Sequence, residues 1–155
     1  MRTVPVFLLL VGLSAAAATP SPGGSEVWAV AVFPSGAEFS LEIAADEASR
    51  SRGYMFREKV GRREGMLFPY DKSGHYSFWM KNCKVPLDII WLDESFKVVE
   101  VAHDRPPCPR EGECPLITPA RPARYILEVA GGTAREEGLG LGDRIHIQWN
   151  PTLHP

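Results

Sequence analysis

The sequence predicts a β-dominated α+β domain, built as a compact barrel-like or sandwich-like antiparallel sheet with about two short helices. Three observations support this class. About eight short β-rich runs follow one another with turn signals at close spacing. Only two brief segments carry helix start and stop signals. Of the 155 residues, 45% are hydrophobic and 23% are charged, a balance typical of an ordinary globular domain.

The N-terminus has the pattern of a secretory signal peptide over residues 1–18. One basic residue, Arg2, precedes an apolar run over residues 4–13, and small residues then end at Ala18, as in an A-x-A cleavage site. The apolar run is shorter than the ~20 residues that a membrane-spanning helix needs. We therefore expect export to a periplasmic or extracellular location, with no membrane association after cleavage.

The remaining chain is expected to form one domain. A linker rich in Pro, Ser and Gly covers residues 19–25, a single β-rich domain covers 26–150, and a short tail covers 151–155. This length suits one hydrophobic core and is too short for two. The formal net charge of −2 attracts neither nucleic acid nor an anionic membrane. We expect a monomer that does not bind nucleic acid.

The elements follow from local signals. Two β-rich runs, at residues 27–33 and 38–43, flank a Pro-Ser-Gly turn and predict a hairpin. Asp46 is the expected N-cap of a two-turn helix that ends at Gly53. A turn is expected at residues 69–74. Later strands are predicted at residues 66–68, 76–82, 87–92, 97–102, 124–130 and 144–149, with a second short helix at 133–137.

The expected export would place the three cysteines in an oxidising compartment, where disulfides form. Cys108 and Cys114 bracket a Pro-rich segment, and a disulfide between them would restrain a loop with no secondary structure of its own. Closing that loop is worth roughly 2.4 kcal/mol on the chain-entropy model. Cys83 is then the unpaired cysteine, which we interpret as a small buried apolar residue. A reactive thiol assisted by His75 or His103 stays an alternative.

Two carboxylates stand within apolar strands, Asp88 at 87–92 and Glu128 at 124–130. Because a buried carboxylate is costly unless it is paired or hydrogen-bonded, each is either part of a site or a structural latch. We favour the structural role. As a pair they could instead serve acid/base chemistry if their carboxyl groups lie ~5 to 9.5 Å apart.

The sequence contains none of the common motifs for zinc proteases, serine hydrolases or nucleotide binding. The sequence has no HExxH, no nucleophile elbow and no phosphate-binding glycine loop. Met55, Met66 and Met80, with Cys83 and a histidine, form a possible set of soft ligands for copper, but methionines more often fill gaps between aromatic core residues. We expect no resident metal and no cofactor.

Five segments carry a family resemblance: RGYMFREKV at 52–60, EGMLFPY at 64–70, FWMKNCKVPLDIIWLD at 78–93, RYILEVAGG at 124–132 and GLGLGDRI at 138–145. Over residues 39–149 they resemble the domain of unknown function 192 family, which is widespread in bacteria and archaea. The resemblance implies a compact β-barrel-like α+β domain, often exported, without an established activity. Cys83 departs from the family pattern, which usually has threonine there. The loop with Cys108 and Cys114 looks like an elaboration.

These observations favour a non-enzymatic exported module that binds a small ligand or a partner protein. The expected pocket is lined by Arg57, Met66, Trp79 and Met80, with Asn82 and Asp88 as polar anchors. Two alternatives stay open: an enzyme that uses Asp88 and Glu128 as acid/base groups, and a soft-metal carrier.

Overall fold

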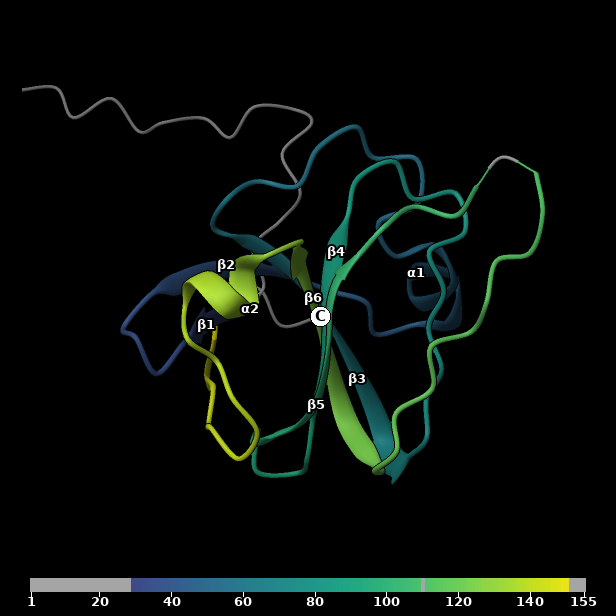
Figure 1. Ribbon diagram of the computed structural model, residues 1–155. Coiled ribbons are helices and arrows are strands. Elements are labelled where there is room, and N and C mark those ends of the chain that lie inside the picture. The colour runs from purple at the N-terminus through teal and green to yellow at the C-terminus, as the bar shows by residue number, and fades with distance from the viewer. Residues whose placement is uncertain (1–28, 110, 151–155) are drawn as a thin grey trace, which may run out of the picture.

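A computed structural model describes residues 29–109 and 111–150 of the chain (Figure 1). The expected signal peptide, linker and C-terminal tail lie outside these residues. The described part forms a sheet and two short helices, with these bounds: β1 Ala29–Val32, β2 Glu38–Ile43, α1 Glu47–Arg52, β3 Glu64–Gly74, β4 Leu87–Leu92, β5 Val98–Arg105, β6 Ala123–Ala130, α2 Thr133–Glu136 and β7 His146–Trp149.

All seven strands belong to one sheet, in the order β5-β4-β6-β3-β2-β1-β7. Every neighbouring pair is antiparallel except β2 and β3, which are parallel. A parallel pair needs a crossover connection, and the segment with α1 supplies it here. The prediction of a β-dominated α+β domain with two short helices is confirmed. The sheet is mixed and open, however, and not a closed antiparallel barrel.

The two edges of the sheet approach each other at one end. Lys97, beside β5, forms an isolated antiparallel bridge with Arg144, which precedes β7. The backbone N–H of Ile145 donates to the carbonyl oxygen of Phe96 over 3.0 Å, and that of Val98 donates to Asp143 over 2.8 Å. The sheet therefore curls without closing.

The two faces of the sheet carry separate cores because side chains alternate along each strand. On β6, Leu127 and Val129 belong to one cluster, whereas Ile126 belongs to the other. Figure 1 shows α2 with β1 and β2 on one side of the central strands, and α1 with the long loops on the other. Ala134 of α2 is part of the first cluster, which we name the α2-side core. The second, which includes Met66, is the α1-side core.

Local signals at α1 behave as predicted. The Asp46 carboxylate accepts a hydrogen bond from the backbone N–H of Ser49, and the Ser49 hydroxyl accepts one from the Asp46 N–H, which together form a capping box. Gly53 ends the helix with a φ of 46°. No residue of α1 is buried. The segment that follows it, beginning with the buried Tyr54, anchors the helix to the α1-side core.

Two predictions around β3 are wrong. β3 continues through Pro69 to Gly74 where a turn was expected, and the register with β6 shifts between these residues. An irregularity of this kind is where a strand tolerates proline. Residues 76–82 form no strand. Only Phe78 pairs, in an isolated bridge with Ile117, and its ring packs edge-on against Phe68. The segment covers the sheet instead of extending it.

Candidate functional site

Asp88, the carboxylate in the most apolar strand, is fully buried on the α2 side of β4. One carboxylate oxygen accepts hydrogen bonds from the backbone N–H groups of Asp104 and Gly132, over 2.6 and 3.1 Å. The other accepts from Ala134, over 2.6 Å. Gly132 is the N-cap of α2 and has no side chain to bond the first turn, so Asp88 satisfies that turn from the neighbouring strand. All of its contacts are of a structural kind.

Glu128 projects to the opposite face of the sheet. In the β4–β6 register Asp88 lies opposite Val129, whereas Glu128 lies opposite Ile89. Directly opposed residues share a face, and consecutive residues alternate. The two carboxyl groups are therefore separated by the sheet. This geometry does not provide the acid/base pair that the sequence left open.

The Glu128 carboxyl group is buried without a full set of partners. Its side chain lies between Met66 of β3 and Ile89 of β4, and its relative exposure is 4%. The Oε2 atom is buried and forms no hydrogen bond within the described residues. Burial raises the pKa of Glu128 to about 8, against the opposing effect of the Arg57 charge. At neutral pH the group is thus mainly a neutral acid that can donate one hydrogen bond.

A small pocket opens beside this carboxyl group, and we name it the Glu128 pocket. It encloses about 30 Å³, with Gly53, Tyr54, Phe68, Phe78, Trp79 and Cys83 among its lining residues. Its volume fits one water molecule or one small polar group. A Cβ atom at Gly53 would lie 3.4 Å from Glu128 Oε2 and 3.5 Å from Phe68, which is van der Waals contact, so the Gly53 backbone lies close to the carboxyl group. Trp79 also lines the pocket and is 41% exposed.

Only one member of the predicted pocket, Trp79, lines the Glu128 pocket. Met66 and Met80 are buried in the α1-side core. Arg57 is committed to Glu42, with two N–O contacts of 2.5 and 2.6 Å, and its guanidinium lies 4.8 Å from the Tyr54 ring centre.

Two other members have separate surroundings. Asn82 adopts a φ of 57°, and its carbonyl oxygen accepts a hydrogen bond from the Phe56 N–H. Asp88 lies across the sheet from the pocket. The residues that sequence reasoning missed are Gly53, Tyr54, Phe68 and Phe78. Two of these lie in the RGYMF segment, whose family resemblance was the available signal.

The cysteines divide as predicted into a disulfide and a free thiol. Cys108 and Cys114 form a disulfide, which confirms the expected pairing. Cys83 is half-buried, and burial raises the pKa of its thiol to about 11, assisted by the nearby Glu128 charge. Because the thiolate is the nucleophilic form, this environment makes Cys83 a poor nucleophile.

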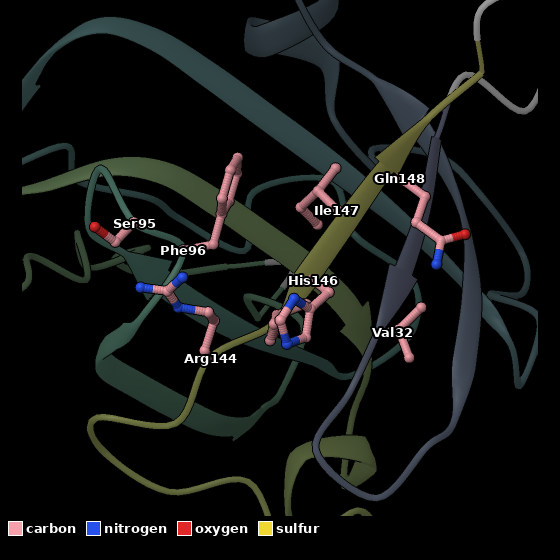
Figure 2. Close-up of a pocket in the computed structure, with 8 residues that line it drawn as sticks. Val32, Ser95, Phe96, Arg144, His146, Ile147 and Gln148 are labelled. Carbon is pink, nitrogen blue, oxygen red and sulfur yellow. The ribbon is translucent and has the colours of Figure 1, made fainter.

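A larger concavity of about 510 Å³ lies along the edge strand β7 (Figure 2). Figure 2 shows Arg144 extending toward Ser95, with Ile147 on the Phe96 side of the strand. No residue of the predicted pocket lines it, and none of its lining side chains carries a buried polar atom without a partner. This concavity is therefore larger than the Glu128 pocket but lacks a buried polar atom that needs a partner.

Within residues 29–109 and 111–150, no three His, Cys, Asp or Glu side chains gather at a possible metal site. Over the same part of the chain, no helix has the length and apolar character needed to cross a bilayer.

The fold and the pocket define a class of protein: a small sheet-dominated α+β domain with a buried carboxyl group, one oxygen of which has no hydrogen-bond partner among the described residues, in a pocket lined by an exposed tryptophan. The chain belongs to the DUF192 family, described as an uncharacterized ACR, whose family model matches residues 30–147.

Relatives with known sequences or structures agree with this assignment. The chain is similar to the UPF0127 protein TK1120 of Thermococcus kodakarensis, with 29% identity over 112 residues, 72% of this chain and 66% of that protein. The matched part thus spans just under two thirds of that relative. A protein of unknown function from Novosphingobium aromaticivorans has a similar crystal structure, with a TM-score of 0.70 and 31% identity over 85% of this chain and 94% of that one. The crystal structure of a candidate transcription regulator from Sinorhizobium meliloti is also similar, with a TM-score of 0.68 and 26% identity. The match covers 79% of this chain and 97% of that one.

Proposed function

We propose that this protein is an exported, non-enzymatic module that binds a small molecule through the Glu128 pocket. The observation that carries the proposal is the buried Oε2 atom of Glu128, which has no hydrogen-bond partner within the described residues. A polar atom in this state raises the free energy of the folded protein by about 1–3 kcal/mol. A ligand that supplies the missing bond recovers that energy on binding.

The size and the charge state of the pocket limit the group that enters it. At about 30 Å³ the pocket takes one hydroxyl, carbonyl or amide group and not a whole molecule. A neutral Glu128 carboxyl donates to an oxygen acceptor and accepts from a hydroxyl or amide donor. The remainder of the ligand would lie against Trp79, which lines the pocket and is 41% exposed.

Phe56 adds a second indication of use on this surface. It has a φ of 65°, a left-handed conformation that is rare for a bulky residue and costs on the order of 1–3 kcal/mol. The hydrogen bond from its N–H to Asn82, 2.8 Å long, holds the strained backbone in place. Phe56 is 59% exposed and directly follows Met55, which lines the Glu128 pocket. A strained, exposed aromatic residue in this position is more typical of a binding surface than of packing.

Acid catalysis by Glu128 is the second candidate function. A carboxylic acid with a pKa near 8 resembles the general acids of enzymes that work at neutral pH. Among the described residues, however, neither Cys83 nor Glu42 is suited to be its catalytic partner. The Cys83 thiol has a raised pKa, and Glu42, two strands away, is bound to Arg57. An enzyme would lose turnover and keep substrate binding in Glu128→Gln, whereas a binding module has no turnover to lose.

Nucleic-acid binding has less support. The similar fold from Sinorhizobium meliloti is described as a candidate transcription regulator, but the present chain has a formal net charge of −2. A protein that binds DNA through phosphate contacts needs a basic face.

Export is supported by the Cys108–Cys114 disulfide, because such bonds persist mainly in oxidising compartments. The expected signal peptide provides the route. Intact-mass measurement of the protein recovered from outside the cytoplasm tests this part, with removal of residues 1–18 and retention of the disulfide as the expected result. An uncleaved chain with reduced cysteines would contradict it.

The binding proposal is tested with neutral polar fragments and ¹⁵N-labelled protein. We expect acetamide or ethylene glycol to shift the amide signals of Gly53 and Trp79 saturably. Glu128→Leu should abolish these shifts. Glu128→Gln, which keeps a donor and an acceptor, should retain affinity within about threefold. Shifts that persist unchanged in Glu128→Leu, or no saturable shift with any fragment, would refute the pocket as a binding site.

A further inference from the structure

A third concavity, lined by residues of α1, β3 and β6, has a different chemistry. It measures about 520 Å³, within the range of small-molecule sites. We name it the arginine–tyrosine groove. Arg50, Arg124, Lys72, Asp71, Tyr70 and Tyr76 are among its lining residues. It shares Arg50 with the Glu128 pocket, but it contains neither Glu128 nor Trp79.

The groove is positively charged although the chain is not. Three cationic side chains and one anionic side chain, Asp71, line it, whereas the whole chain has a formal net charge of −2. Within the described residues, neither Arg50 nor Arg124 forms an ion pair with a carboxylate. Other arginines of the same protein do, among them Arg57 with Glu42 and Arg63 with Glu137.

Backbone carbonyl groups hold both guanidinium groups in place. Arg50 donates through Nη1 to the carbonyl oxygens of Ala45 and Pro69. Arg124 donates through Nε to the carbonyl oxygen of Tyr70 over 3.3 Å. These bonds fix the groups without neutralising them. They leave the Nη2 atom of Arg50 and both Nη atoms of Arg124 without a hydrogen-bond partner among the described residues.

Aromatic rings add rigidity to the same wall. Tyr70 and Tyr76 are stacked, with ring centres 3.5 Å apart, and the Arg50 guanidinium lies 5.3 Å from the Tyr70 ring centre. The Tyr76 hydroxyl donates to the carbonyl oxygen of Lys72, which anchors its ring. An arginine that is already ordered loses less side-chain entropy when it binds a ligand.

We propose that the arginine–tyrosine groove binds the anionic group of a small molecule, a carboxylate or a phosphate, between Arg50 and Arg124. Guanidinium nitrogens match the oxygens of both groups in bidentate geometry. This site is independent of the function proposed for the Glu128 pocket, and the two fail or succeed separately.

The test is a titration of ¹⁵N-labelled protein at constant ionic strength, with inorganic phosphate in one arm and benzoate in the other. We expect saturable shifts of the amide signals of Tyr70, Asp71 and Arg124, with a Kd on the order of 1 mM in at least one arm. The stronger arm identifies phosphate or carboxylate as the preferred group. Absence of saturation up to about 50 mM in both arms would overturn the proposal.

A matched pair of variants separates a built site from diffuse charge. Arg124→Gln should weaken binding at least about tenfold, whereas Arg121→Gln, an equal change of charge at an exposed arginine outside the groove, should change it less than about twofold. Equal weakening by both variants would also overturn the proposal. If Arg124→Gln does not fold, the shifts mapped on the wild-type protein decide the matter alone.

Discussion

Replacing Glu128 by glutamine should make the protein's stability less dependent on pH. The carboxyl group is buried, and its pKa rises from an ordinary 4.5 to about 8 in the folded state. Between these values the unfolded chain releases the proton and the folded chain keeps it. The folded state therefore binds more protons, and the free energy of unfolding falls as the pH rises through this window. Below about pH 4.5 and above about pH 8 the contribution is constant.

The magnitude follows from the same pKa values. At about 1.4 kcal/mol per pH unit, the interval corresponds to about 5 kcal/mol, which is an upper limit because solvent entry and local relaxation reduce it. Glutamine has nearly the same shape and does not ionise. The variant should gain stability relative to the wild type as the pH rises from 5 to 8, by as much as about half of a small domain's total stability.

Urea unfolding at several pH values between 5 and 9, followed by tryptophan fluorescence, measures this difference. The two proteins share every other ionisable group, so any contribution common to both cancels in the comparison. Glu38→Gln, at an exposed position on β2, is the control and should run parallel to the wild type. Parallel curves for Glu128→Gln and the wild type, within about 0.5 kcal/mol, would show that Glu128 is ionised in the folded state and would refute the reasoning.

Three further outcomes are expected. Asp88→Ala leaves three backbone N–H groups without their acceptor and should lower the free energy of unfolding by about 3–5 kcal/mol, whereas the exposed Asp71→Ala should change it by less than about 0.5 kcal/mol in the same urea assay. Alkylation of Cys83 by iodoacetamide should be slow at pH 8 and accelerate toward pH 11 in mass-spectrometric time courses, and rapid modification at pH 7 would contradict the buried thiol. Replacing Cys108 and Cys114 together by serine should cost roughly 2.4 kcal/mol, and an unchanged thermal midpoint would show that the loop is ordered without the bond.

Local chemistry made much of the fold predictable. The capping residue Asp46 and the terminating Gly53 define α1 from sequence alone because their contacts are short-range. The strand predicted at residues 76–82 was wrong because the position of this segment depends on long-range packing. Every second residue from Tyr76 to Met80 is apolar and at least partly buried, as in a strand. Phe78, however, packs edge-on against Phe68 and Trp91 of the sheet beneath it. Alternation records which side chains are buried and does not distinguish a strand within the sheet from a segment that covers it.

The candidate site was less predictable because it depends on long-range register. The burial of Asp88 could be anticipated, but its three donors lie between 16 and 46 residues away in the chain. The relation between Asp88 and Glu128 depends on a single pairing, Asp88 with Val129. A slip of one residue would place both carboxylates on one face and would support the enzyme interpretation. No local pattern in either strand specifies that choice.

If the proposed function holds, the two buried carboxylates divide structural and functional work between the two faces of one sheet. Asp88 fixes the turn that follows β6, through Gly132 and Ala134, and thereby holds the C-terminal end of the strand that carries Glu128. Its burial is compensated by donors, so selection for stability accounts for it. The burial of Glu128 is not compensated within the described residues, and an apolar residue there would fold more favourably. A group that costs stability and faces a pocket lined by an exposed tryptophan is what the proposed binding function would require.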